Sequence, residues 1–410
     1  MANHHTIQRA TIDLLLPNSE QVEISTAKEW CTSVLLEELD VALSERCPED
    51  QVLVMSTLQL DLIFSRWNEP LRSDQKNALR QQIRQQLAEQ TAVSAVRMPL
   101  PEYRAEILLR YLQSGTLPDI YTQLEWSELK AAFQEASQKN RPFQERLLRA
   151  LIDEAAFRRW LSITDEPERY MWLDERVPIV SGSWQEIILR LQKEVVGQQP
   201  EKPVSVAQLL QTIIRLITKG VGNESATVTD SDLALQQAIR TENNTPAVPA
   251  AGLVLVANFL PAFLRTVGLL DAANTFVSVR RVPMLLYCLA TGETEAREWQ
   301  LVLPKLLCGL PFSESCDTSI TLSEQERQEI NNLLTDVIDH WKQLKTTTPD
   351  GLRATFLQRV GRLTEKDAIF TLTIAEQTVD ILLSFVPWSF RYVRFSWMPK
   401  LLITEWGNKA

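Results

Sequence analysis

The clearest hydrophobic pattern in the chain lies over residues 324–344. Apolar side chains recur there at offsets of three and four residues, as on one face of a helix. Ser323 and Glu326 have the spacing of a capping box, in which each side chain binds the other's backbone amide. The pattern predicts an amphipathic helix whose buried face is Ile330, Leu333, Leu334, Val337, Ile338, Trp341 and Leu344.

The first 70 residues change period several times. Residues 7–16 are rich in β-favouring side chains, and residues 22–24 form a second short extended piece. From residue 26 the apolar positions follow helical spacing, and residues 52–64 then alternate, most clearly at 58–62. We therefore expect a β-β-α-β unit over residues 1–70.

Helical periods interrupted by proline occupy residues 71–219. Proline lacks an amide hydrogen and its ring clashes with the preceding turn, so it marks the places where a helical pattern stops. Such stops occur at Pro99, Pro101, Pro118 and Pro142. The pattern predicts separate helices over residues 73–90, 102–114, 126–139 and 143–161.

The second half of the chain begins with a polar stretch and ends in β patterns. Residues 220–252 are small and polar and predict a linker. Residues 253–410 are apolar again, with strand alternation at 370–374 and 401–406, and with breaks at Pro387 and Pro399. We expect an α+β fold that is predominantly helical, with short β elements near the N-terminus and at the C-terminus, in two or more globular parts.

Composition and charge narrow the class of protein. Among 410 residues, 45% are hydrophobic and 23% are charged, as in ordinary proteins with buried cores. The net charge of −10 disfavours nucleic acid as a partner. The N-terminal residues show no secretory signal, and the most apolar stretch, 253–270, is interrupted by Asn258, Pro261 and Arg265. We expect a cytoplasmic protein without stable membrane insertion.

Residues that could carry catalysis are sparse. The five cysteines include no CxxC pair, which indicates reduced thiols that fill the core. The 12 glycines form no phosphate-binding loop. Of three histidines, only His340 lies in a predicted helix, next to Trp341, where a boundary residue is the simplest interpretation. We expect no catalytic residues, no cofactor and no metal site.

Tryptophan is concentrated at the C-terminal end. Trp388, Trp397 and Trp406 fall within the last 23 residues, and Arg391 and Arg394 lie between them. One interpretation is that these indoles close a small β core. The other is that these five residues bind a partner protein, because tryptophan and arginine are favoured at the energetic centre of interfaces. Both interpretations can hold together.

A set of ordered blocks in the C-terminal part carries a family resemblance. These blocks read NFLP at 258–261, VGLL at 267–270, LLYCLATG at 285–292, LLCGLP at 306–311, HWKQLK at 340–345, TPDGLR at 348–353, FLQR at 356–359, VPWS at 386–389, WMPK at 397–400 and EW at 405–406. Together they resemble the tape measure proteins of contractile injection systems, which are phage-tail-like particles.

The resemblance implies a non-enzymatic assembly protein that acts as a tape measure or tube-length regulator. Its implied partners are inner tube, baseplate or cap proteins, and self-association stays open. Its implied location is the cytoplasm during assembly, with retention in the particle lumen left open. The alternative is an assembly chaperone or terminal adaptor of the same particle that does not set length.

Overall fold

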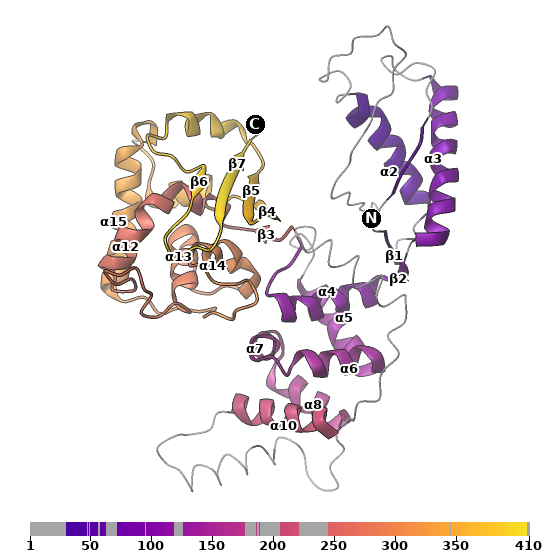
Figure 1. The fold of residues 1–410 in the computed structure, drawn as a ribbon, viewed down its shortest axis with the longest axis horizontal. Helices are drawn as coiled ribbons and strands as arrows, with labels where there is room; N and C mark the ends of the chain where they lie inside the picture. Colours follow the sequence, from indigo (N-terminus) through magenta and orange to yellow (C-terminus); the bar gives the residue numbers. More distant parts are fainter. Residues whose placement is uncertain are drawn as a thin grey trace. The chain divides into compact units, whose positions relative to one another are not determined.

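The computed structural model describes residues 30–46, 48, 50–55, 58–62, 72–94, 96–118, 126–176, 186, 188, 206–220, 245–344 and 346–407. The chain divides into two compact units, one from residues 1–104 and 227–242 and one from residues 105–226 and 243–410 (Figure 1). Helices predominate, and short strands occur in both units. This confirms the predicted mainly helical α+β class.

Two helices and a small sheet make up the described part of the first unit. A π-helical turn, η1 (Cys31–Leu35), leads into α2 (Leu36–Arg46), which packs on α3 (Ser73–Ser94). β1 (Gln51–Val54) pairs antiparallel with β2 (Val96–Pro99). The core between α2 and α3 consists of Leu39, Ala42, Leu79, Ile83 and Leu87.

The predicted strand over residues 52–64 is wrong in extent, because only its first residues, in β1, join a sheet within the described part of the chain. Residues 58–62 are bound by side-chain amides of α3 instead. The Gln59 and Asp61 N–H groups donate to Oε1 of Gln90 (3.0 Å) and Gln86 (2.8 Å). The Gln86 and Gln90 amides donate back to the Asp61 and Gln59 carbonyls. The predicted alternation still holds for packing, since Leu58, Leu60 and Leu62 contact the α2–α3 core.

Other predictions for the N-terminal residues stay predictions. Residues 7–16 and 22–29 lie outside the described residues, so the two expected strands there and the first turn of the expected helix are not addressed. The helix predicted from residue 26 onward is present from Trp30 to Arg46.

The helical part of the second unit contains a series of short helices. The helix predicted over 126–139 is confirmed as α5, and that over 102–114 as α4, whose residues from Ala105 onward belong to this unit. The series is α4 (Leu100–Ser114), α5 (Trp126–Lys139), α6 (Arg141–Ala150), α7 (Glu154–Ile163), α8 (Glu166–Arg176) and α10 (Val206–Gly220).

The single helix predicted over residues 143–161 is wrong, because two helices, α6 and α7, occupy this stretch. The N-cap of α6 is Asn140, whose side chain accepts from the Phe143 N–H at 3.1 Å, and Pro142 lies in the first turn of the helix rather than at a stop. The Asp153 side chain caps α7 by accepting from the Ala156 N–H at 2.9 Å. The break contains neither proline nor glycine, so this cap was its main local signal.

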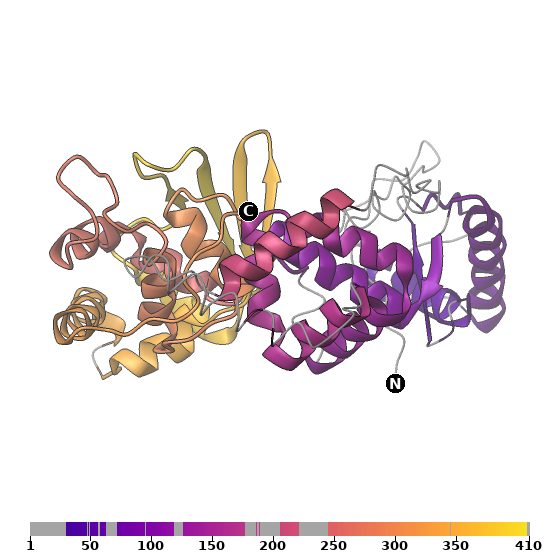
Figure 2. The ribbon, with the colours of Figure 1, turned by 90° about the horizontal axis from the view of Figure 1, so that it is seen from below.

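The C-terminal part of the second unit is an α+β domain (Figure 1; Figure 2). Its first strand, β3, lies within residues 220–252 of the predicted linker, the rest of which is mostly outside the described residues. The order is β3 (Ala247–Val248), η3 (Ala251–Phe259), α12 (Leu260–Thr266), α13 (Val282–Thr291), η4 (Glu298–Leu301), α14 (Val302–Leu307), α15 (Glu324–His340), η5 (Lys342–Leu344), α16 (Pro349–Leu352), η6 (Arg353–Leu357), β4 (Gly361–Lys366), β5 (Ile369–Ile374), η7 (Thr378–Phe385), β6 (Tyr392–Val393) and β7 (Leu401–Trp406).

The sheet of this domain has the strand order β3-β4-β5-β7-β6. Neighbouring strands are antiparallel except β5 and β7, which are parallel. Leu363, Leu372 and Leu402 point to the buried side, as the period-two pattern requires. The strand predicted over 401–406 is β7, and that over 370–374 is β5, so both predictions are confirmed.

Helix α15 confirms the strongest sequence pattern. Ser323 and Glu326 form the predicted capping box, and all seven predicted apolar side chains are buried. The α-helix ends at His340 with Trp341 as its C-cap, and η5 continues the predicted range to Leu344. The Trp341 ring lies 4.8 Å from the Phe356 ring, so α15 is fixed to the segment that precedes the sheet.

Candidate functional site

The three C-terminal tryptophans are half-buried, and each uses its indole N–H in a hydrogen bond. Trp388 donates to the Leu255 carbonyl at 2.7 Å, and Trp397 donates to the Leu307 carbonyl at 2.8 Å. Trp406 donates to Oδ2 of Asp380 at 3.0 Å. The first two bonds join the C-terminal segment to helical segments 133 and 90 positions earlier in the chain. These hydrogen bonds therefore support the interpretation that the indoles close the domain.

Each indole also contacts an aromatic ring, with centroids close enough for edge-to-face packing. Trp388 stands against Phe259 at 5.1 Å, and Trp397 against Phe276 at 5.4 Å. Trp406 lies 6.2 Å from Phe390. The half-exposed indoles are thus held by rigid neighbours, which lowers the entropy cost of any partner contact that they make.

A buried ion pair between Arg359 and Asp380 contacts Trp406. Arg359 donates to both carboxylate oxygens of Asp380, at 2.6 and 2.9 Å, and its guanidinium lies 5.4 Å from the Trp406 ring centre. Burial alone would raise the pKa of Asp380. Hydrogen bonds from Arg359, the Gln377 amide and Trp406 outweigh burial and lower this pKa below its ordinary value of 3.8. Asp380 is therefore ionised and fixes the Trp406 indole.

Arg391 and Arg394 are exposed, as a surface role requires. The Arg391 guanidinium lies 5.9 Å from the ring centre of Tyr392, and within the described part of the chain neither arginine forms an ion pair. The structure thus places the five predicted residues on one short C-terminal segment, with three indoles anchored in the domain and two guanidinium groups directed to solvent.

Residues within this segment and just before it expose apolar side chains that the sequence analysis did not single out. Ile381 is 70% exposed, Phe385 is 52% exposed and Tyr392 is 57% exposed. A sequence signal was present, because residues 381–404 contain no Asp or Glu in a chain that has 52 of them. This combination of apolar and basic groups is typical of a protein-binding surface.

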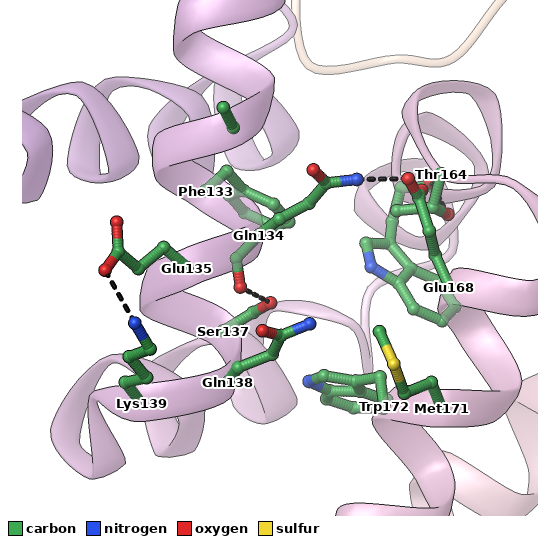
Figure 3. Close-up of a pocket in the computed structure, with 12 residues that line it drawn as sticks. Phe133, Gln134, Glu135, Ser137, Gln138, Lys139, Thr164, Glu168, Met171 and Trp172 are labelled. Carbon is green, nitrogen blue, oxygen red and sulfur yellow. Dashed lines mark hydrogen bonds and ion pairs between the residues drawn. The ribbon is translucent and has the colours of Figure 1, made fainter.

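A pocket of about 520 Å³ lies among α5, α7 and α8 (Figure 3). Trp160, Trp172, Phe133 and Met171 line it with apolar surface. Its carboxylates are engaged in ion pairs, Glu168 with Lys130 at 3.2 Å and Glu135 with Lys139 at 2.9 Å. The Gln134 amide also donates to Glu168. This geometry suits an apolar side chain of a partner and offers no matched acid and base.

Other features that could carry chemistry are consistent with structural roles. His340 is exposed, and its Nδ1 lies 2.6 Å from the Asp336 carbonyl of the preceding turn. Cys31, Cys288, Cys308 and Cys316 are buried free thiols, and burial raises the pKa of Cys316 to about 12. Over the described ranges no cluster of His, Cys, Asp and Glu could hold a metal ion. Within those same ranges no helix combines the length and apolarity needed to cross a membrane.

The structure defines a mainly helical α+β protein whose C-terminal segment combines anchored indoles with exposed basic and apolar side chains. The chain matches the family model of the contractile injection system tape measure proteins over residues 3–245 and 180–406, which together cover most of its length. It therefore belongs to that family. No curated protein and no solved structure matches the chain.

Proposed function

We propose that this protein is a non-enzymatic assembly factor of a contractile injection particle that acts as a tape measure or regulator of tube length. The family match over residues 3–245 and 180–406 is the observation that carries the proposal. The described polar clusters support the non-enzymatic part of it, because their charged groups are engaged in structural ion pairs.

The C-terminal surface supports a role in protein contacts. Arg391, Arg394 and Tyr392 are exposed in the same segment of the chain as the anchored indoles of Trp388 and Trp406. We propose that inner tube, baseplate or cap proteins bind here while the particle assembles in the cytoplasm. Residues of this kind can contribute strongly to binding when a partner covers them and excludes water.

The length of the chain limits how it could measure a tube. As a continuous helix, 410 residues would span about 600 Å at ~1.5 Å per residue. Fully extended they would span at most about 1,400 Å at ~3.4 Å per residue. The second unit is compact, so a ruler of these lengths requires the chain to open.

The alternative is an assembly chaperone or terminal adaptor that works in its compact form. The observation that favours it is the densely packed α+β domain of the second unit, in which residues from Val248 to Leu402 share one buried core. An adaptor binds tube or cap subunits through its surface and leaves tube length unchanged.

Deletion of the gene from a strain that produces the particle tests the assembly role. We expect few particles, or particles of irregular length, while tube and sheath proteins are still made. Complementation with the intact gene should restore number and length. Normal numbers of normal-length particles in the deletion strain would remove both the tape measure and the adaptor roles.

A further inference from the structure

Three buried charged side chains join the helical part of the second unit to its α+β domain. Arg159 lies on α7, Glu298 begins η4 and Lys305 lies on α14. Their side chains are exposed by 0%, 4% and 1%. Arg159 and Glu298 are 139 positions apart. Such a set is costly to bury, so its presence requires a close fit of the two parts.

Arg159 makes the contacts that cross between the parts. Its Nε and Nη2 donate to Oε1 of Glu298 at 3.0 and 2.9 Å. Its Nη1 donates to the Leu112 carbonyl at the end of α4, at 2.6 Å, and its Nη2 also donates to the Ser313 carbonyl. One guanidinium thus binds the helical part and the α+β domain together.

Lys305 completes the cluster from inside the α+β domain. Its Nζ donates to Oε1 of Glu298 at 2.5 Å and to the Phe312 carbonyl at 3.0 Å. Glu298 therefore faces two cations, and backbone carbonyls accept further hydrogen bonds from both of them. Without Arg159, the pair of Glu298 and Lys305 would still be neutral and hydrogen-bonded within its own domain.

Contacts around the cluster show that the two parts fit closely. Gly115 has φ of +74°, and a Cβ at this position would lie 2.3 Å from the Phe312 carbonyl oxygen. The Ala247 N–H donates to the Leu117 carbonyl at 3.1 Å. The Arg297 guanidinium lies 4.7 Å from the ring centre of Trp126. Opening the cluster therefore separates a packed interface and is not the loss of a single bond.

We propose that the Arg159–Glu298–Lys305 cluster is a latch. It fixes Arg159 to Glu298 and so closes the chain between these two residues into a loop. This inference rests on the proposed function in one respect, namely that a tape measure must extend. While the latch is closed, the 139 positions between Arg159 and Glu298 add no length to a stretched chain. When it opens, they add at most about 460–500 Å at ~3.3–3.6 Å per residue.

Hydrogen exchange of the full chain, read by mass spectrometry, tests the latch. In the Arg159→Met variant we expect amide exchange in α4–α8 to accelerate by about 100-fold, the order expected when Glu298 and the Leu112 and Ser313 carbonyls lose their shared buried donor. Exchange in α13–α15 should change much less, because the Glu298–Lys305 pair stays intact. The matched control is Arg158→Met on the same helix, whose exposed pair with Glu154 should contribute little.

Each outcome decides the proposal. Selective acceleration in α4–α8, absent from the control, supports the latch. Equal acceleration in both parts means that the cluster only stabilises the whole unit, and no acceleration means that it does not hold the parts together; either result overturns the latch.

A second measurement covers the case in which Arg159→Met does not fold. Stretching the wild-type chain by its ends in optical tweezers should release residues 105–407 in one step. Two independent steps would overturn the latch. Neither measurement uses particles, so the latch and the tape measure role can fail separately. If the purified protein confirms the latch but particle length is unchanged in the variant, the latch is retained and the tape measure role is contradicted.

Discussion

Replacing Val337 by alanine or aspartate tests the packing of α15 on the sheet domain. Val337 is 1% exposed, and it faces the core together with Leu333, Leu334 and Ile338. The alanine change removes two carbons, worth about 0.8 kcal/mol each in transfer free energy, and leaves a cavity that adds to the cost. We expect about 2–3 kcal/mol of lost unfolding free energy.

The aspartate change acts through a different cost. A carboxylate at this position is surrounded by apolar side chains, and burying an unpaired charge costs several kcal/mol or forces protonation of the group. We expect the loss for Val337→Asp to exceed that for Val337→Ala by ~2 kcal/mol or more. The second unit of the Val337→Asp variant should then no longer show a cooperative unfolding transition at moderate urea concentration.

Urea and thermal unfolding, followed by near-ultraviolet circular dichroism, measure both changes. Thr335→Ala is the matched control, because Thr335 is exposed on the same helix. It should change the unfolding free energy by less than about 0.5 kcal/mol. If Val337→Asp unfolds at the same urea concentration as the parent protein, α15 is not packed as described.

Three further predictions concern the C-terminal surface and the absence of cofactors. The folded pKa of Asp380 lies below its ordinary value of 3.8. Its contribution to the unfolding free energy is therefore present above that value and is lost as pH falls through the folded pKa. In Asp380→Asn the unfolding free energy should depend less on pH at acid pH. Trp397→Ala should reduce particle yield in a strain whose variant protein is folded by circular dichroism, whereas Trp397→Phe should reduce it less; normal yield with Trp397→Ala would leave the indole with its structural role alone. Zinc or ATP should not raise the melting temperature of the purified protein, and stoichiometric binding of either would contradict the expectation of no cofactor and no metal site.

The elements that were predicted correctly carry their sequence signals within their own residues. Helix α15 carries both its periodicity and its capping box in its own residues, and β7 carries a clear alternation before Gly407. The break between α6 and α7 was missed because only the cap at Asp153 marks it. Residues 58–62 alternate like a strand, but whether they pair with a strand or with glutamine side chains depends on the distant helix α3.

Only part of the site could be predicted from the sequence. The aromatic and basic residues from Trp388 to Trp406 stand out by composition, but their exposure depends on packing. The latch could not be predicted, because Arg159 and Glu298 resemble ordinary surface residues of amphipathic segments. Lys305 gave a weak signal, since it is the one charged residue in the apolar stretch of α14.

Particle length as a function of chain length tests the central claim most directly. Helix-forming and flexible insertions of 30 residues would be placed between residues 220 and 245, in the predicted linker, and particles would be imaged by electron microscopy. A ruler predicts tubes longer by about 45 Å if the insertion is helical and by at most about 110 Å if it is fully extended. A matched deletion in the same stretch should shorten the tubes. Particles of unchanged length and normal number with every insertion and deletion would contradict the tape measure role and favour the adaptor.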